Sequence, residues 1–252
     1  MNQTIDTILN HRSIRSFKDE PLTEEQISTI VQCAQAAATS SYLQVYSIIG
    51  VKEPVKKKKL AELAGNQEYV EDNGHFFVFC ADLNRHKLAA ELEGIPIENV
   101  IETLESTEKF MVGMIDAALA AQNAVIAAES MGLGICFIGG LRNNLPEVAK
   151  VLKTPDRVVP LFGLCVGVPD QQPGQKQRLP IDNVYHVDEY IQDESQFKQQ
   201  LSNYNEDISD YYLKRTQGKR SHTWTEIVTG KMTKPVRMYM KDFLKSIKLP
   251  LK

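Results

Sequence analysis

Residues 132–144, GLGICFIGGLRNN, decide between the fold classes open to this chain. An apolar run ends in two adjacent glycines and a polar cluster, which is typical of a strand followed by a tight turn. Adjacent glycines let the backbone approach a flat ligand closely, because no Cβ stands in the way. No G-x-G-x-x-G follows a strand, and no G-x-x-x-x-G-K-[ST] occurs, so neither a Rossmann unit nor a P-loop is predicted. An ordinary strand-to-helix turn is the alternative interpretation of the glycine pair.

A second polar cluster lies near the N-terminus, in residues 11–17, HRSIRSF. Two guanidiniums, an imidazole and two hydroxyls follow a short amphipathic turn that contains Ile5, Ile8 and Leu9. Arginine forks and hydroxyls supply the charge and the several donors that a phosphate needs. The alternative is a basic helix end that only stabilises its own dipole. Taken together, the two clusters predict a flat, phosphate-bearing cofactor held outside a Rossmann unit.

The composition limits the class of protein. The chain has 252 residues, 42% of them hydrophobic, which is enough for one large domain or two small ones. Its net charge of −3 offers no basic field for nucleic acid, and the lysine run at 56–59 is expected to be a solvated helix face. Cys33, Cys80, Cys136 and Cys165 are widely spaced within apolar stretches. They predict buried free thiols in a reducing compartment, and no metal site, because neither they nor the histidines have ligand spacing.

One apolar stretch, residues 110–131, is long enough to cross a membrane. Asp116, Gln122, Asn123 and Glu129 interrupt it, and a central Asp alone costs about 2.5–3.5 kcal/mol in hydrocarbon. A buried central helix is therefore predicted, with no membrane partner. Its small residues suit the close approach of another helix at a subunit interface: they are Gly113, Ala117, Ala118, Ala120, Ala121 and Ala124. The first residues lack the features of a signal peptide, so a cytoplasmic protein is expected.

Local patterns predict alternating helices and strands. A capping box at its start and apolar residues at helical spacing predict a helix over 23–38. Runs rich in β-branched and aromatic residues predict strands at 46–51, 75–81, 135–138 and 158–166. Residues 171–175, QQPGQ, are interpreted as a loop. Residues 185–252 are expected to be mostly helical, with apolar stripes that need a partner surface.

Seven short motifs occur in order along the chain. They are HRSIRSF at 11–17, SSYLQ at 40–44, FCADLNRH at 79–86, IGGLRNN at 138–144, PLFGLCVG at 160–167, RLP at 178–180 and TW at 223–224. From about residue 4 onward, the chain thereby resembles the flavin reductase and nitroreductase superfamily, in particular its branch of NADPH-preferring, oxygen-insensitive nitroreductases and NADPH–FMN oxidoreductases.

The resemblance implies an α+β fold with a mixed, mainly antiparallel sheet flanked by helices. It implies a single FMN-binding domain over residues 1–252, in which residues 184–252 form a C-terminal helical extension that wraps the core or a partner subunit. It also implies an obligate homodimer with FMN in a cleft at the interface. The cofactor-binding residues implied are His11, Arg12, Ser13, Ile14, Arg15, Thr39, Ser40, Ser41, Gln67, Tyr69, Phe137, Ile138, Gly139, Gly140, Lys176, Gln177 and Arg178.

The resemblance assigns these residues different roles. Residues 11–13 are expected on phosphate or ribityl oxygens. Arg15 is expected near the pyrimidine edge, where a cation stabilises the negative charge of the reduced flavin. The hydroxyls of residues 39–41 come from the partner chain. Gln67 and Tyr69 lie beside the flavin edge, although Gln67 taken alone is simply a loop residue.

The remaining positions are expected on one flavin face and at the anion site. Residues 137–140 line the face, and their glycines allow reacting atoms to approach to roughly 3–3.5 Å. Lys176 and Arg178 complete the anion site. The family pattern reads Lys-Pro-Arg there, so Gln177 is a departure that predicts weaker retention of FMN. A solvent-exposed basic loop is the alternative interpretation.

The implied reaction needs no acid–base side chain, and no catalytic residue is assigned. NADPH gives hydride to flavin N5, and a nitroaromatic, quinone or free flavin then takes two electrons in a ping-pong cycle. The cations expected to hold NADPH are Arg15, Lys214, Arg215, Lys219 and Arg220, although the last four also fit a solubilising helix end. A dedicated NADPH–FMN reductase that supplies reduced flavin, or a non-catalytic flavin-binding protein, is the alternative function.

Overall fold

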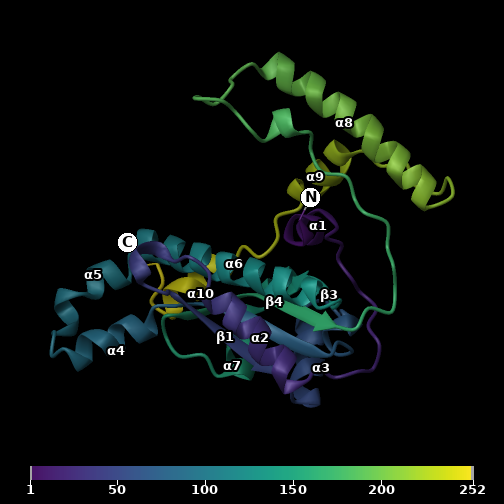
Figure 1. Cartoon of the computed structure of the whole chain (residues 1–252). Helices are drawn as coiled ribbons and strands as arrows, with labels where there is room; N and C mark the ends of the chain where they lie inside the picture. Colours follow the sequence, from purple (N-terminus) through teal and green to yellow (C-terminus); the bar gives the residue numbers. More distant parts are fainter. Residues whose placement is uncertain (1, 251–252) are drawn as a thin grey trace. The chain divides into compact units, whose positions relative to one another are not determined.

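The computed structural model describes residues 2–250, which divide into two compact units. The first unit comprises residues 2–173 together with 237–250, and the second is Gly174–Val236 (Figure 1). The second unit is therefore an insertion between the body of the first unit and its last helix. Each unit is described by itself.

The first unit is built on a four-stranded antiparallel sheet. Its strands are β1 (Tyr46–Val51), β2 (His75–Asp82), β3 (Gly134–Ile138) and β4 (Val158–Gly167), in the order β1-β2-β4-β3. The four predicted strands are confirmed to within one residue at each end. All eight residues of β2 are buried, which explains why that stretch is an unbroken apolar run.

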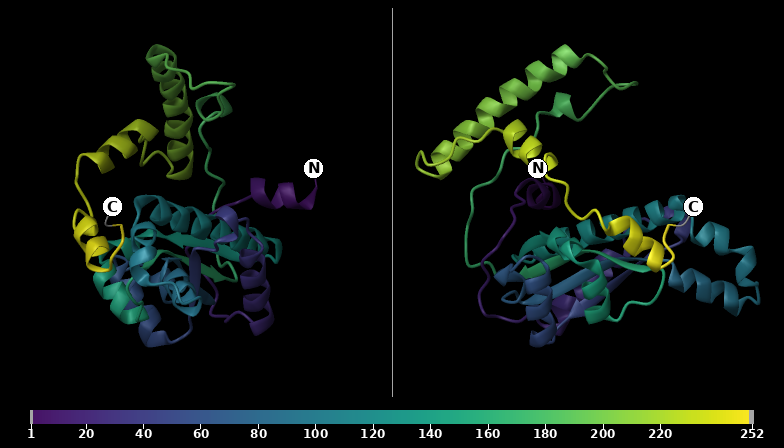
Figure 2. Two further views of the ribbon diagram at one scale, coloured as in Figure 1. Left: turned by 90° about the vertical axis from the view of Figure 1, so that its left-hand side faces the viewer. Right: turned by 180° about the vertical axis from the view of Figure 1, so that it is seen from behind.

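Helices cover both faces of the sheet (Figure 2). On one face, Phe77 and Phe79 pack in the core that includes α2 (Glu24–Gln35), α6 (Thr107–Ser130) and α10 (Met240–Ser246). On the other face, Phe76 and Val78 pack with α3 (Pro54–Leu63) and Val148 of α7 (Leu145–Leu152). This alternation follows from the two-residue period of a strand. The last helix returns to the same core, where Phe243 and Leu249 are buried.

The remaining helices of the first unit are short. They are α1 (Gln3–Leu9), α4 (Asn84–Leu92) and α5 (Ile101–Leu104), with 3-10 turns at Ser40–Tyr42, Glu68–Val70, Ile97–Asn99 and Gly139–Asn143. The capping box of α2 is confirmed: the Thr23 hydroxyl and the Gln26 side chain each bond the other residue's backbone. The helix ends at Gln35 instead of 38, because the chain turns there to bring the Ser40 N–H to Asp116.

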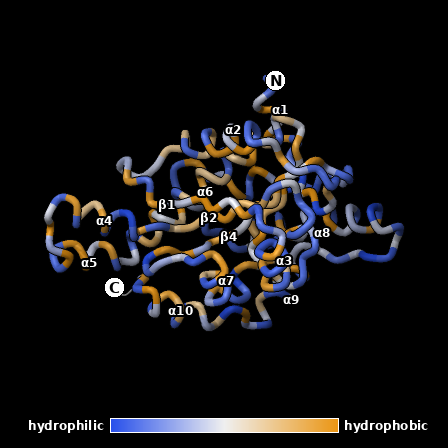
Figure 3. Tube along the Cα trace, turned by 90° about the horizontal axis from the view of Figure 1, so that it is seen from below, coloured by the Kyte–Doolittle hydropathy of each residue, from blue (hydrophilic) through white to orange (hydrophobic). Residues whose placement is uncertain are grey.

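The central helix α6 is buried along much of its length, as predicted. By length and composition alone it could cross a membrane; Figure 3 colours the chain by the hydropathy of its residues. Of the apolar window of α6, 56% is buried in the protein. Of the six small residues predicted to face a subunit, only Ala118 is exposed; the other five are buried within the chain instead of facing a subunit surface. Gly113, for instance, faces the chain's own core, where a Cβ would lie 3.0 Å from that of Ala81. The large apolar side chains that α6 exposes are Met111, Met114, Ile115 and Leu119.

Two surface expectations need correction. Lys57 is not part of a fully solvated lysine face: its Nζ donates to the Asn73 carbonyl at 2.6 Å, and burial lowers the pKa of its ammonium. All four cysteines are free, but Cys33 is only half-buried, since it lies near the end of α2. The other three thiols are buried as predicted.

The second unit contains the helices α8 (Glu194–Arg215) and α9 (Trp224–Met232), after a 3-10 turn at Ile181–Asn183. The Asn205 side chain joins the two helices through reciprocal hydrogen bonds with Thr225, at 2.8 and 3.1 Å. The expected helical content is confirmed. Of the apolar stripe, Tyr204 and Ile208 are buried, whereas Tyr190 and Leu213 are exposed.

Candidate functional site

The N-terminal motif lies along the free edge of β3. Ser13 pairs in parallel with Ile135, and the Ile14 N–H donates to the Ile135 carbonyl at 2.8 Å. Ile14 is buried over Gly134, where a Cβ would lie 2.6 Å from the Ile14 side chain. The motif therefore extends the sheet by a short strand. This pairing places its polar side chains beside the strand that leads into the glycine pair.

Gln67 and Tyr69 meet the glycine pair at the end of β3. The Tyr69 hydroxyl donates to Gln67 Oε1 at 2.7 Å, and Gln67 Nε2 donates to the Ala64 carbonyl at 2.9 Å. A Cβ on Gly140 would collide with that carbonyl and lie 2.8 Å from Gln67 Nε2. Glycine is thus required at position 140 by a close backbone approach.

Arg15 belongs to the same cluster. Burial raises the pKa of the Tyr69 hydroxyl, and the charge of Arg15 and a hydrogen bond with it oppose that rise. Burial likewise raises the pKa of the Cys136 thiol, again against the charge of Arg15. The structure therefore brings together Arg15, Gln67, Tyr69 and Gly140, hereafter the Arg15 cluster.

The backbone of Arg15 is held as well as its side chain. With its amide oriented by the hydrogen-bond network, the Gln171 oxygen accepts from the N–H groups of Arg15 and Ser16, the latter at 3.0 Å. The Asp170 N–H in turn donates to the Ser16 carbonyl at 2.9 Å. Gln171 was interpreted from the sequence only as a loop residue.

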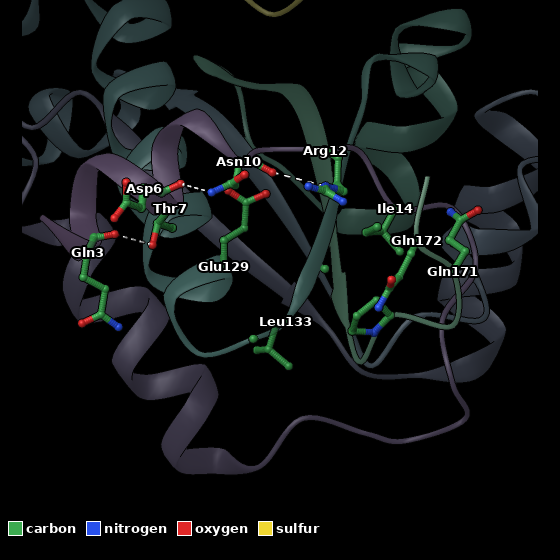
Figure 4. Close-up of a pocket in the computed structure, with 13 residues that line it drawn as sticks. Gln3, Asp6, Thr7, Asn10, Arg12, Ile14, Glu129, Leu133, Gln171 and Gln172 are labelled. Atoms are coloured by element: carbon green, nitrogen blue, oxygen red, sulfur yellow. Dashed lines mark hydrogen bonds between the residues drawn. The ribbon is translucent and has the colours of Figure 1, made fainter. Parts of the chain in front are cut away.

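His11 and Arg12 face a different environment. His11 Nδ1 lies 2.6 Å from a carboxylate oxygen of Glu129, whose side chain is 13% exposed. Arg12 Nε donates to the Asn10 carbonyl at 3.3 Å and lines a cavity of about 630 Å³ (Figure 4). The cavity is lined by Gln3, Asp6, Thr7, Asn10, Arg12, Ile14, Glu129, Gly132, Leu133, Gly134, Pro169, Gln171 and Gln172. The motif is thus split between this cavity and the Arg15 cluster.

The serine loop, residues 39–45, is attached elsewhere on α6. The Ser40 N–H donates to Asp116 Oδ1 at 3.1 Å, and the Val45 N–H donates to Asp116 Oδ2 at 3.0 Å. Asp116 and Glu129 are separated by about 20 Å along the helix axis, at 1.5 Å per residue. One chain therefore does not bring Thr39, Ser40 and Ser41 to the place where α6 holds the N-terminal motif.

The glycine turn is supported by residues from the end of the chain. The Tyr239 hydroxyl donates to the Arg142 carbonyl at 2.8 Å and accepts from the Leu145 N–H at 2.7 Å. Arg237 donates twice to Asn143 Oδ1, at 3.1 and 2.9 Å. Just before the turn, Ile138 is buried and the Phe137 ring is 41% exposed. No local sequence signal predicts these contacts.

In the second unit, the loop around residues 176–178 is docked on α8. Lys176 Nζ lies 3.1 Å from the Tyr212 hydroxyl, and the Tyr204 hydroxyl donates to the Gln177 carbonyl at 3.2 Å. Burial raises the pKa of Tyr204, and the charge of Arg178 opposes that rise, so Arg178 lies near this contact. Gln177, which departs from the family pattern, is thus anchored to α8 through its backbone carbonyl.

The tail cations occupy two places in this unit. The Arg220 guanidinium lies over the Tyr212 ring, 5.8 Å from its centroid, so it shares one tyrosine with Lys176. Lys214 and Arg215 instead line a cavity of about 490 Å³ that also contains Asp207 and Asp210. Arg215 also lies over the Tyr211 ring, which contacts the Tyr212 ring at 5.4 Å between centroids.

Family models cover most of the chain. The model of the nitroreductase family matches residues 8–168, and the model of the C-terminal domain of the nitroreductase family matches residues 176–252. The chain belongs to the nitroreductase family.

Particular relatives are similar over nearly their whole length. The chain is 58% identical over 245 residues to FMN reductase (NADPH) of Bacillus subtilis (strain 168), covering 97% of both chains. It is 42% identical over 246 residues to NADPH-flavin oxidoreductase of Vibrio harveyi, covering 98% of both. The solved structure of B. megaterium NfrA1 matches with a TM-score of 0.96 and 58% identity, over 99% of this chain and 100% of that one. The fold expected from the resemblance is confirmed.

Proposed function

We propose that this chain is an FMN-dependent enzyme that takes hydride from NADPH and passes two electrons to free flavin, nitroaromatics or quinones. The Arg15 cluster is the observation that carries the proposal, because it joins a cation, an amide and a hydroxyl to a glycine turn. The relatives named above, an FMN reductase (NADPH) and an NADPH-flavin oxidoreductase, support the same activity.

The residues of the cluster fit a flavin. Because Gly140 has no Cβ, the turn packs directly on the Ala64 carbonyl and Gln67, and both glycines of the turn stay partly exposed. Phe137 presents a partly exposed aromatic ring directly before the turn. FMN, when bound, supplies the two-electron carrier. Arg15 would hold a positive charge at the pyrimidine edge, which stabilises the charge that develops on reduction.

The other assignments follow the resemblance. His11, Arg12 and Ser13 would bind phosphate or ribityl oxygens, and Lys176 and Arg178 would bind the phosphate as an anion-binding loop. Lys214, Arg215, Lys219 and Arg220 are the candidate cations for the 2′-phosphate of NADPH. We propose a cytoplasmic homodimer, with the chain working as one FMN-binding domain whose C-terminal extension, residues 184–252, wraps the core or the partner subunit.

The homodimer would supply the serine loop from a second copy. The separation of the two anchors on α6 supports this arrangement, because a single chain holds its serine loop and its N-terminal motif apart. Tyr42, in the middle of the loop, is 83% exposed and free to face a partner.

Anaerobic absorbance spectroscopy of the purified protein tests the proposal. We expect a yellow protein that is bleached stoichiometrically by NADPH, more slowly by NADH, and reoxidised by free FMN or a nitroaromatic. A protein that neither takes up FMN nor bleaches would contradict the proposal. Bleaching without reoxidation by any acceptor would favour the non-catalytic flavin-binding alternative.

A further inference from the structure

We propose that Asp116 is a positioning residue for the cofactor site: it sets the conformation of the serine loop, and through the loop it tunes FMN binding in the partner subunit. This inference rests on the proposed function. Asp116 entered the sequence argument only as an interruption of an apolar helix.

Asp116 is a fully buried carboxylate whose hydrogen bonds both go to the loop backbone. It has no exposed surface, and its two oxygens each accept one N–H, from Ser40 and from Val45. No ion pair to Asp116 is formed within residues 2–250. A buried charge is costly unless it is hydrogen-bonded, so a side chain that only filled space here would be apolar.

The loop between these two bonds has a strained backbone. Ser41, Tyr42 and Gln44 have φ values of +47°, +60° and +53°, in the left-handed region that favours glycine. A side chain in this region is disfavoured, because its Cβ crowds the backbone. The strained residues lie between the two N–H groups that Asp116 accepts. The carboxylate therefore closes the loop at both ends and opposes its relaxation.

The serine loop, closed in this way, exposes side chains to solvent. Ser40 and Ser41 are exposed, and Tyr42, between the two N–H groups that bond Asp116, is 83% exposed. On α6 itself, the neighbouring Ile115 and Leu119 are exposed apolar residues. Asp116 therefore links a buried helix position to a loop and a helix face that are both available to a second copy of the chain.

Asp116→Asn is the direct test. Asparagine keeps the size of the side chain and one acceptor oxygen, but its amide N–H₂ faces a backbone N–H. One of the two hydrogen bonds to the loop is therefore lost. We expect the Kd for FMN, measured by quenching of flavin fluorescence with apoprotein, to rise about tenfold. Sedimentation and circular dichroism should still report a folded dimer.

Asn123→Ala is the matched control. Asn123 lies on the same helix, and its side chain donates to the Cys33 carbonyl at 3.2 Å, well away from the loop. This variant should lower the thermal midpoint and leave the Kd for FMN within twofold. Equal rises in Kd in both variants would show that general destabilisation is the cause, and the positioning role would be wrong.

A double-mutant cycle separates positioning from packing. Ser41→Ala should raise the Kd for FMN several-fold in the native background and have little further effect beside Asp116→Asn, because the loop is already displaced. Additive effects, or native affinity in Asp116→Asn, would overturn the inference. If the unaltered chain binds no FMN, the proposed function fails instead, and the two failures are distinguishable.

A second variant covers the case in which Asp116→Asn does not fold. Gln44→Gly removes the left-handed cost of that residue but frees its backbone. If Asp116 holds the loop, the Kd for FMN should stay within twofold. A fivefold rise would mean that Gln44 itself sets the conformation, which contradicts the inference.

Discussion

Arg15 is restrained through its backbone and through its side chain. Gln171 accepts from its backbone N–H, Ser16 beside it is bonded to Asp170, and its guanidinium lies against Tyr69. Restraint of this kind lowers the entropy lost when a long side chain acts on a ligand. The residue is therefore suited to placing a positive charge at one point of a bound cofactor.

Arg15→Ala should slow flavin reduction by NADPH more than it weakens FMN binding. Removing a fixed charge from a developing anion costs about 1.4–2.8 kcal/mol, which is ten- to hundred-fold in rate. Anaerobic stopped-flow absorbance measures the rate, and Arg15→Lys is the control that keeps a charge without the fork. If rate and affinity were both unchanged, Arg15 would have no such role.

Glu129 restrains the side chain of His11, as Gln171 restrains the backbone of Arg15. A carboxylate oxygen 2.6 Å from Nδ1 holds the His11 ring in one orientation. Glu129→Gln should therefore raise the Kd for FMN about three- to tenfold, in line with about 0.6–1.4 kcal/mol for one hydrogen bond. Titration of apoprotein measures it. An unchanged Kd would mean that His11 does not contact the cofactor.

At the scale of elements, the turn after β3 is held by residues from the end of the chain, among them the hydroxyl of Tyr239. Tyr239 precedes α10 and bonds both the Arg142 carbonyl and the Leu145 N–H. The first of these groups ends the 3-10 turn, and the second begins α7. The last segment of the chain thus fixes the backbone of the turn that contains the glycine pair.

Tyr239→Phe removes this hydroxyl and keeps the packed ring. We expect the free energy of unfolding to fall by about 1–2 kcal/mol, because a buried N–H and a carbonyl each lose a partner. Flavin reduction should also slow. Urea denaturation and stopped-flow absorbance give the two values. Tyr46→Phe, in the same core, is the control, and equal rate losses in both variants would argue against a role for the turn.

In the second unit, the candidate cations Lys214 and Arg215 end α8, and Lys219 and Arg220 lie between α8 and α9. Arg215 lines its cavity together with Lys214, and a 2′-phosphate would add two negative charges there. Arg215→Glu should raise the KM for NADPH at least tenfold and leave the KM for NADH nearly unchanged. Steady-state kinetics with both donors decides this. An equal rise for both would remove the 2′-phosphate role.

At the scale of the whole molecule, one buried histidine links stability to pH. Burial, with Lys52 and Lys57 nearby, lowers the pKa of His75 to about 4, whereas Glu24 opposes the shift. In the unfolded chain the pKa is the ordinary 6.5. Between these values the unfolded state binds a proton that the folded state does not. Stability is therefore undiminished above pH 6.5 and falls as the pH drops toward 4.

The loss in the free energy of unfolding that is due to His75 should approach about 3 kcal/mol at pH 4. Denaturant midpoints at pH 7.5, 6 and 4.5 measure it, and His75→Gln should flatten the profile over this range. A variant whose midpoint falls as steeply as that of the native chain would place the acid sensitivity elsewhere.

The strands, the capping box of α2 and the family were determined by the sequence itself, because each depends on residues that are close together in the chain. The apolar, β-branched run at 46–51, the Thr23–Gln26 pair and the ordered motifs are all local or nearly local patterns. The residues that shape the site are different. Glu129 meets His11 across 118 positions, and Asp116 meets Val45 across 71.

Only the tertiary structure assigned these partners, because nothing local distinguishes a buried carboxylate that accepts distant N–H groups from one that faces solvent. The polar interruptions of α6 illustrate the point. In the sequence, Asp116, Asn123 and Glu129 argued only against a membrane span. In the fold they bond the serine loop, α2 and the N-terminal motif, since a buried polar group must find a partner wherever packing brings one.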